Sequence, residues 1–312
     1  MHKRALGYKN IIDAGKPMDY ACLEENIASL TAKFKFTENI IIGQSYLGKN
    51  INLIKMGSGA HKVIYIGSHH ASEWLTSLIL MRFAEDFCKS YIFGERLFGY
   101  DPEYILYSRT FYILPMLNPD GVDLVINGLG EYNPVRSRLI QMNGGSGDFS
   151  RWQANARGVD LNHNYDAGYA LLKQIEEDSG IISPCPTRYG GEYPESEPEV
   201  SSLVSFIRGQ GDISLLAALH TQGEVIYWTY NNIIPPKSKT LANLVARATG
   251  YKLEYPDEEI ASYGGCKDWF ISKFNRPGFT IECGKGVNPL PLSDFPGIYN
   301  HIAKALILLA MN

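Results

Sequence analysis

Lys62-Val-Ile-Tyr-Ile-Gly67 is an almost uninterrupted apolar run, and it passes directly into the polar stretch Ser68-His-His-Ala-Ser-Glu-Trp74. Apolar runs of this length are typical of buried strands, and the next residues, 74–89, have the broad apolar face of an amphipathic helix. A strand that ends in a polar turn and enters a helix is the unit of α/β folds with a parallel sheet. Such sheets bind their ligands at the carboxyl ends of the strands, so we expect ligand-binding or catalytic residues in this turn.

Strands and helices alternate in the same way along the rest of the chain. We expect strands at residues 39–43, 51–56, 62–67, 109–114, 214–220, 224–230 and 279–283. We expect helices at residues 19–34, 74–89, 196–208, 237–249, 267–274 and 293–309. Residues 128–158 and 184–198 contain many turn signals and little periodicity, and we expect them to be irregular. Since no linker or repeat divides these elements, the sequence predicts one α/β domain over residues 18–312, preceded by a short N-terminal extension over residues 1–17.

The composition is that of an ordinary globular protein and excludes several other classes. Hydrophobic residues make up 45% of the 312 residues and charged residues 20%, which excludes disorder, collagen and a coiled coil as the main architecture. The net charge of −4 disfavours a nucleic-acid partner, because such proteins usually carry a basic face. The longest apolar run, residues 305–311, is far short of the ~20 residues that span a bilayer, so we expect no membrane partner.

The cysteines and the first residues predict the compartment. The five cysteines are odd in number, widely spaced and without a Cys-x-x-Cys pair, which does not fit a disulfide framework or a structural zinc site. Reduced thiols are typical of the cytoplasm. The first residues are basic, but no apolar core follows them as it would in a signal peptide. We therefore expect a cytoplasmic protein, and the sequence does not predict its oligomeric state.

Three residues at expected strand ends have side chains that could share a metal ion. His70 and Glu73 stand three residues apart in the turn after the strand 62–67, and His220 closes the apolar run 214–219. Imidazole and carboxylate both suit Zn²⁺, and two histidines with one glutamate leave a fourth position open for water, which is the pattern of catalytic zinc. Each residue also has a plainer interpretation: Glu73 as a favourable charge in the first turn of a helix, and His220 as a satisfied structural histidine.

Glu282 interrupts the run Phe279-Thr-Ile-Glu-Cys-Gly284, which otherwise has the pattern of a buried strand. A buried carboxylate is costly unless it is paired or hydrogen-bonded. One interpretation is a glutamate at a strand end that faces solvent, and the other is a general base that takes a proton from an attacking water.

These residues occur together with three longer motifs. The motifs are Leu117-Asn-Pro-Asp-Gly121, Arg157-Gly-Val-Asp-Leu-Asn162 and Gly264-Gly-Cys-Lys-Asp-Trp269. In this order, and with the candidate metal ligands and Glu282, the chain resembles the zinc metallocarboxypeptidase family, of which carboxypeptidase A is the best-known member. The resemblance covers about residues 68–284, and Ile42-Gly-Gln-Ser-Tyr-Leu-Gly-Lys49 extends it toward the N-terminus.

The resemblance implies a fold, a cofactor and a set of roles. The implied fold is a mixed, mostly parallel twisted sheet of eight strands flanked by helices, and the implied cofactor is one Zn²⁺ per chain. His70, Glu73 and His220 would be the metal ligands, and Glu282 would be the general base. Asp160 would orient a ligand histidine, although an aspartate here could also only order its own loop.

Several positions depart from the family pattern where the family binds its substrate. His163 in the pair Asn162-His163 replaces an arginine, which removes a fork suited to a terminal carboxylate, and a structural histidine is the alternative. Gln153 stands where the family has the arginine that stabilises the oxyanion. Arg157 is our candidate replacement, and Arg151 is the next option.

Two further departures lie beside the Gly-Gly pair. Ile260 stands where the family has a mobile tyrosine, and Tyr263 could substitute for it in part, although packing is the plainer role. Lys267 stands at the base of the family's specificity pocket, where its charge would favour a substrate carboxylate. The alternative is an exposed lysine on a helix.

Two stretches resemble one branch of the family more closely. Pro186-Thr-Arg-Tyr-Gly-Gly-Glu-Tyr-Pro-Glu-Ser-Glu-Pro-Glu199 and Glu282-Cys-Gly-Lys-Gly-Val-Asn-Pro-Leu-Pro291 are similar to the γ-D-glutamyl-L-diamino acid endopeptidases. The resemblance implies zinc-dependent hydrolysis of the γ-D-glutamyl–meso-diaminopimelate amide bond of peptidoglycan, with a short acidic peptide, the muropeptide stem, as substrate. Arg188 and its loop would form one wall of the cleft.

Three other functions stay open at this point. A metallocarboxypeptidase would release a C-terminal residue from ordinary peptides. An amidohydrolase of small N-acyl amino acids shares the ligand set, but the Asn-Pro-Asp-Gly and Gly-Gly-x-x-Asp-Trp segments disfavour it. A non-catalytic zinc or peptide-binding module is disfavoured because Glu282 accompanies all three ligands.

Overall fold

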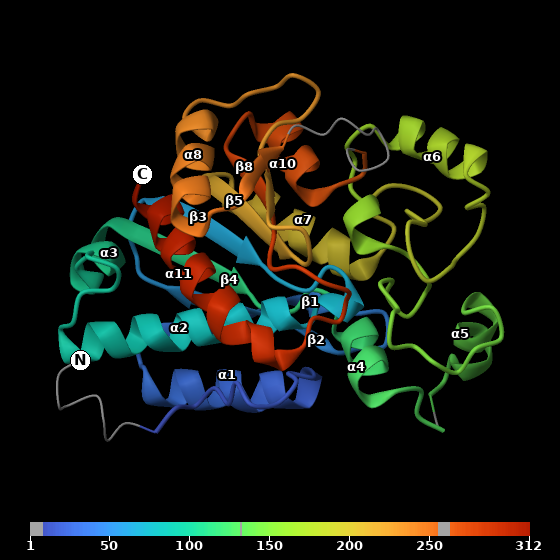
Figure 1. Ribbon diagram of the computed structural model, residues 1–312, viewed down its shortest axis with the longest axis horizontal. Coiled ribbons are helices and arrows are strands. Elements are labelled where there is room, and N and C mark those ends of the chain that lie inside the picture. Colours follow the sequence, from blue (N-terminus) through green and yellow to red (C-terminus); the bar gives the residue numbers. More distant parts are fainter. Residues whose placement is uncertain (1–8, 132, 255–262) are drawn as a thin grey trace.

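The computed structural model describes residues 9–131, 133–254 and 263–312, and the named strands of this part of the chain form one eight-stranded sheet (Figure 1). The strand order across the sheet is β1-β2-β4-β3-β5-β8-β6-β7. The strands are β1 (Thr37–Gln44), β2 (Asn50–Met56), β3 (His61–Ile66), β4 (Arg109–Leu114), β5 (Ile213–His220), β6 (Val225–Tyr227), β7 (Lys252–Glu254) and β8 (Gly278–Glu282).

Parallel pairing occupies the middle of the sheet. β4, β3, β5 and β8 run parallel to one another, and β6 and β7 form a second parallel pair. The pairings β1–β2, β2–β4 and β8–β6 are antiparallel. This confirms the mixed, mostly parallel sheet. The expected strand 224–230 is wrong in length, since only β6 forms there, and β7 was not expected because three residues carry no readable period.

Helices cover both faces of the sheet. The helices that the sequence predicted are α1 (Tyr20–Lys33), α2 (Leu75–Phe93), α7 (Pro198–Gln210), α8 (Ser238–Thr249), α10 (Cys266–Phe274) and α11 (Phe295–Met311). Successive side chains of a strand point to opposite faces, so Val63 and Tyr65 pack in the core with α1, α2, α8 and α11. Ile64 and Ile66 pack in the other core, with α7 and α10. Figure 1 shows α2 and α11 in front of the strands.

Four short helices in the described part of the chain were not predicted. They are α3 (Pro102–Ser108), α4 (Pro119–Asn127), α5 (Arg136–Met142) and α6 (Tyr169–Asp178). The expectation that residues 128–158 are irregular is therefore wrong where α5 forms. Helices of seven to ten residues span too few turns for an apolar period to stand out. The start of α4 carries ordinary helix signals, because the Asn118 side chain accepts a hydrogen bond from Gly121 N at 3.0 Å and Pro119 occupies the first turn.

The described part of the expected N-terminal extension, residues 9–17, packs against α2. The backbone N–H groups of Ile11 and Ile12 donate to the Glu85 carboxylate at 2.7 and 3.0 Å. The Ile12 side chain is buried in the core that α1 and α2 cover. The boundary at residue 18 stays a prediction, and residues 1–8 lie outside the described part of the chain.

Two observations concern membrane spans and disulfides. Among the residues that the structure describes, no helix has both the length and the apolarity needed to cross a membrane. All five cysteines are unpaired thiols, and Cys88, Cys266 and Cys283 are buried.

Candidate metal centre at the carboxyl edge of the sheet

Three neighbouring strands bring the candidate residues to one edge of the sheet. β3, β5 and β8 are adjacent and parallel, so their carboxyl ends meet. The turn after β3 carries His70 and Glu73, while His220 is the last residue of β5 and Glu282 is the last residue of β8. This is the edge at which open parallel sheets bind their ligands.

The turn after β3 follows a close approach between two backbones. A Cβ added to Gly67 would lie 2.5 Å from the Pro115 carbonyl oxygen, so a larger residue would push the turn away from the segment that follows β4. The 3₁₀ helix η2 (Ala71–Glu73) follows, and Ala71 N donates to the Gln153 carbonyl oxygen at 3.0 Å. The turn that carries His70 and Glu73 is thereby tied to the loop that contains Gln153.

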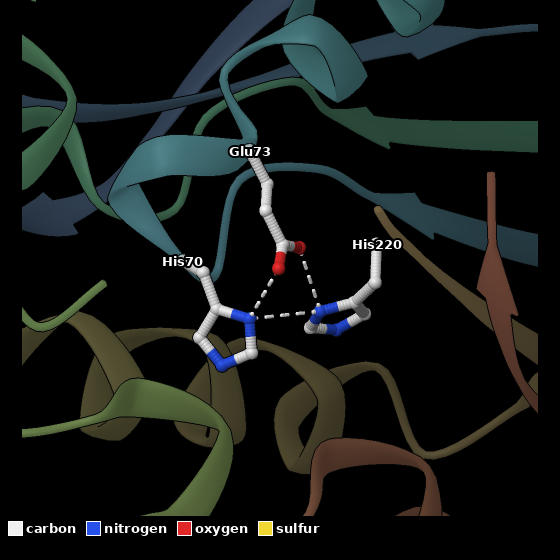
Figure 2. Close-up of side chains that lie close together, drawn as sticks. All are labelled: His70, Glu73 and His220. Atoms are coloured by element: carbon white, nitrogen blue, oxygen red, sulfur yellow. Dashed lines mark hydrogen bonds and ion pairs between the residues drawn. The ribbon is translucent and has the colours of Figure 1, made fainter. Parts of the chain in front are cut away.

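The side chains of His70, Glu73 and His220 point toward one another (Figure 2). His70 Nδ1 lies 2.9 Å from Glu73 Oε1, and His220 Nδ1 lies 3.0 Å from Glu73 Oε2. The two Nδ1 atoms are 3.2 Å apart. Glu73 is 3% exposed and His220 is 1% exposed, whereas the His70 side chain is 15% exposed. The group is therefore nearly closed off and reaches the surface at His70.

The Glu73 carboxylate of this group is held in its ionised form. Burial alone would raise the pKa of Glu73, but His70 and His220 lower it to about 2. Burial alone would lower the pKa of His70, but the Asp160 and Glu73 carboxylates raise it well above its usual range. Two carboxylates around two imidazoles thus create a place where a positive charge is stabilised.

The arrangement fits a zinc ion. Two imidazole nitrogens and a carboxylate are ligands that Zn²⁺ prefers, and one such atom from each residue lies within 4.8 Å of the others. His70 Nε2 donates to Asp160 Oδ1 at 3.0 Å, which is how zinc-binding histidines are commonly fixed. His220 is not a satisfied structural histidine, because its buried Nε2 has no hydrogen-bond partner among the described residues.

Two residues that the sequence analysis did not single out hold the Glu73 carboxylate. Thr221 N donates to Oε2 at 3.1 Å, and Asn288 Nδ2 donates to Oε1 at 3.3 Å. Asn288 also donates to the Thr221 carbonyl oxygen at 2.7 Å, so the two residues form one support. The sequence signal of Thr221 is its position directly after His220, and that of Asn288 is its place in the stretch 282–291, which resembles the γ-D-glutamyl-L-diamino acid endopeptidases.

Glu282 lies beside the group without joining it. In the sheet register it is the neighbour of His220, so the two side chains leave the same face of adjacent strands. Its carboxylate forms no hydrogen bond or ion pair with the residues that the structure describes, and it is partly buried. Burial and the nearby Glu73 carboxylate raise the pKa of Glu282 well above its usual range. Such a group readily accepts a proton.

Asp160 joins the metal group to the loop around Arg188. Its Oδ1 also accepts a hydrogen bond from Asn162 N at 3.1 Å, and its Oδ2 accepts one from Arg188 N at 3.0 Å. His163 Nδ1 donates to the Arg188 carbonyl oxygen at 3.1 Å. Arg188 has a φ of 68°, which is uncommon for a residue other than glycine, and its backbone is held from both sides. Asp160 therefore both orders its loop and orients His70.

Three predicted substrate-binding residues make contacts within the protein. Asn162 Oδ1 accepts a hydrogen bond from Cys266 N at 3.1 Å, at the start of α10. Gln153 Oε1 accepts one from Thr187 Oγ1. Tyr263 is buried in the core with α7 and α10. These contacts fix the loops near the centre, and the substrate-binding roles stay predictions.

Arg157 lies beside a buried group of acidic residues. Its Nε is 3.7 Å from Glu197 Oε2, and its guanidinium carbon is 5.5 Å from the centre of the Tyr46 ring. Asn155 Nδ2 donates to both Glu197 and Glu199, at 2.7 and 3.3 Å. Burial raises the pKa of Glu199 to about 8, which favours its neutral form, and Arg157 lies within ion-pair distance of Glu197. The oxyanion role of Arg157 stays a prediction.

Lys267 is buried beside Asp268. The alternative of an exposed helix lysine is wrong, because the residue is only 5% exposed. Lys267 Nζ donates to the Thr229 carbonyl oxygen at 2.6 Å and contacts Asp268 Oδ1. Its role in a specificity pocket stays a prediction. Ile260, the other departure beside the Gly-Gly pair, lies outside the described residues.

The sheet and its two-histidine, one-glutamate centre define a zinc hydrolase of the carboxypeptidase type, and comparison with known proteins agrees. The zinc carboxypeptidase family model matches residues 23–300. The chain therefore belongs to the zinc carboxypeptidase family. As a member of this family it is a zinc metallopeptidase. Enzymes of this family use one Zn²⁺, and His70, Glu73 and His220 lie together in the structure where that ion would bind.

Two named proteins and one solved structure illustrate what the chain is similar to. The chain is 37% identical over 289 residues to gamma-D-glutamyl-L-diamino acid endopeptidase 1 of Lysinibacillus sphaericus, which covers 93% of this chain and 71% of that protein. It is 27% identical over 259 residues to carboxypeptidase A1 of Sus scrofa, covering 77% and 56%. The fold matches that of bovine thrombin-activatable fibrinolysis inhibitor in complex with tick carboxypeptidase inhibitor, with a TM-score of 0.72 at 22% identity over 95% and 97% of the two chains.

Proposed function

We propose that this chain hydrolyses the γ-D-glutamyl–meso-diaminopimelate amide bond in short acidic peptides of the bacterial cell wall. The observation that carries the proposal is the centre of His70, Glu73 and His220, with the carboxylate of Glu282, which has no partner among the described residues, beside it. A relative that is 37% identical across 93% of the chain is named as an endopeptidase for γ-D-glutamyl-L-diamino acid bonds. That relative supports the muropeptide stem as substrate.

The proposed chemistry is amide hydrolysis with Glu282 as the base. When held by His70, Glu73 and His220, Zn²⁺ would polarise the scissile carbonyl and acidify the attacking water. Glu282 takes the proton of that water and delivers it to the leaving amine nitrogen. Because its carboxylate has no partner among the described residues, both of its oxygens are available for these two transfers. Arg157 is the proposed donor to the oxyanion.

The contacts around the ligands support this role. Asp160 holds Nε2 of His70 and so keeps Nδ1 aimed at the centre. Thr221 and Asn288 hold the Glu73 carboxylate from two sides. Ligands that are fixed in advance need little reorganisation as charge develops during the reaction.

The residues near the centre support an acidic peptide as substrate. They do not supply the arginine that would bind a C-terminal carboxylate. His163 presents a single imidazole whose Nδ1 already donates to the Arg188 carbonyl oxygen, so it lacks the paired N–H groups of an arginine. The Arg188 side chain is exposed and forms no ion pair with the residues that the structure describes. We propose that Arg188 binds a carboxylate of the substrate. Asn162, Gln153, Tyr263 and Lys267 complete the proposed binding region.

A tetrapeptide separates this proposal from carboxypeptidase action. Incubation of the zinc-loaded enzyme with L-Ala-γ-D-Glu-meso-diaminopimelate-D-Ala is expected to produce L-Ala-D-Glu and diaminopimelate-D-Ala, identified by mass spectrometry. A carboxypeptidase would instead remove D-Ala. The matched control is the same peptide with an α-linked D-Glu, which we expect to stay intact because its carboxylate and scissile carbonyl exchange places.

The experiment can contradict the proposal in two ways. Release of D-Ala alone would assign a carboxypeptidase, the second candidate, which the 27% identity to carboxypeptidase A1 supports. Equal cleavage of the α-linked control would show a general peptidase without γ-glutamyl specificity.

We also propose that the enzyme acts on peptide fragments in the cytoplasm. The support is its five unpaired thiols, since disulfides form and persist mainly in oxidising compartments. Fractionation of the producing cells, with detection of the chain by antibody, checks this, and its recovery in the culture medium or the cell wall would contradict it.

A further inference from the structure

His69 precedes the metal ligand His70 and is fully buried. Its ring stacks on the ring of His220, with 5.3 Å between the ring centres and 22° between the planes. His69 Nε2 makes a hydrogen bond of 3.0 Å with the Tyr165 hydroxyl. The Tyr165 ring in turn packs against Trp269, with 5.9 Å between centres. A buried row of rings therefore leads from the core to His220.

The two histidine ligands are fixed in different ways. The ring of His70 is oriented by the hydrogen bond from its Nε2 to Asp160. The Nε2 of His220 is buried and has no hydrogen-bond partner in the part of the chain that the structure describes. Zinc-binding histidines are usually oriented through this second nitrogen. Besides the contact of its Nδ1 with Glu73 Oε2, the orientation of His220 therefore depends on the rings packed against it, those of His69 and His70.

His69 is also a costly residue for a role that is only structural. Its Nδ1 is buried without a hydrogen-bond partner among the described residues, and such burial of a polar atom lowers stability. An apolar side chain would fill the same space without that cost. The His69 ring supplies a flat surface nearly parallel to the His220 ring, and its hydrogen bond to Tyr165 fixes this surface. An aliphatic side chain would supply neither.

We propose that His69 is a positioning residue for the metal ligand His220. Stacking restricts rotation of the His220 ring about its Cβ–Cγ bond, and the hydrogen bond to Tyr165 fixes the plane of His69. His220 Nδ1 is thereby kept on the side of Glu73 and His70. The inference rests on the proposed ligand set and extends it to a residue that touches neither the metal nor the substrate.

Two replacements of His69 separate the flat ring from mere filling of space. His69→Leu fills the cavity but removes the flat ring, whereas His69→Phe keeps a flat, slightly larger ring and loses the hydrogen bond to Tyr165. We expect His69→Leu to weaken Zn²⁺ binding about 10–100-fold, the range seen when the residues that orient metal ligands are changed. His69→Phe is expected to restore most of the affinity. Competition with a chromogenic chelator measures the Zn²⁺ dissociation constant in the full chain.

A spectrum and a matched control test the geometry itself. In the Co²⁺-loaded protein, His69→Leu is expected to shift the visible absorption bands, and His69→Phe is expected to leave them near those of the native protein. His61→Leu is the control, because His61 lies at the opposite end of β3 and is exposed. We expect it to change neither the affinity nor the spectrum.

The outcomes also separate this inference from the proposed function. Native affinity and an unchanged Co²⁺ spectrum in His69→Leu would overturn the positioning role. Equal losses in His69→Leu and His69→Phe would overturn the part assigned to stacking. Failure of the native chain to bind Zn²⁺ would instead overturn the proposed function.

Discussion

Replacing Glu282 with Gln is expected to lower turnover of the tetrapeptide about 10²–10⁴-fold, the usual contribution of general acid–base catalysis. The amide has nearly the same shape as the carboxylate but cannot take a proton from the attacking water. Metal content should stay at one zinc per chain, because Glu282 lies outside the group of three residues that faces the metal position. The measurements are kcat by mass spectrometry of the products and zinc content by elemental analysis.

Glu224→Gln is the matched control for this prediction. Glu224 precedes β6, whose first residue pairs with Glu282, and its carboxylate is ion-paired with Lys285 at 2.7 Å. We expect it to leave both turnover and zinc content unchanged. Full activity in Glu282→Gln would refute the assignment of the base, whereas loss of zinc together with activity would show that Glu282 holds the metal.

Replacing Lys267 with Met is expected to destabilise the fold by about 3–5 kcal/mol, the cost of leaving a buried charge without its partner. Burial already raises the pKa of Asp268, although the neighbouring ammonium of Lys267 lowers it. Without that ammonium, Asp268 would have to be buried unpaired or bind a proton. The midpoint and slope of urea unfolding measure the change.

A double variant and a surface control make this prediction specific. Lys267→Met combined with Asp268→Asn removes both charges and is expected to recover most of the lost stability. Lys55→Met breaks a surface pair with Glu38 and should cost at most about 1 kcal/mol. If Lys267→Met is instead as stable as the native chain and raises only KM for diaminopimelate peptides, the structural role is refuted and only the proposed binding role of Lys267 remains.

The central elements could be predicted because they are long and nearly continuous in apolar character. β3, β4, β5 and β8 are buried parallel strands, and such strands appear in a sequence as short apolar runs. Polar residues at the ends of these runs were noticeable for the same reason, which is how His70, His220 and Glu282 could be found. Short helices such as α5, and the three-residue strand β7, depend on tertiary contacts and leave no such pattern.

The residues that support the centre were harder to predict because their partners are far away in the chain. Asn288 donates to Glu73 across 215 positions, and no local pattern links the two. Lys267 illustrates the opposite problem: its partner Asp268 is the next residue, but a sequence does not show that both are buried. Asp160 could be assigned through a motif, whereas the contact of its second oxygen with Arg188 N appears only in the fold.

The separation of the proposed metal ligands along the chain has a consequence for how much of the protein stays folded in the cell. His70 and His220 are 150 positions apart and meet only when β3 and β5 are paired. An unfolded chain has no such site, so zinc at these ligands binds the native state and adds to its stability. At a free zinc concentration a hundred times the dissociation constant, this linkage amounts to about 2.7 kcal/mol. The metal supply would thus set how much folded enzyme survives proteolysis, as well as how much of it is active.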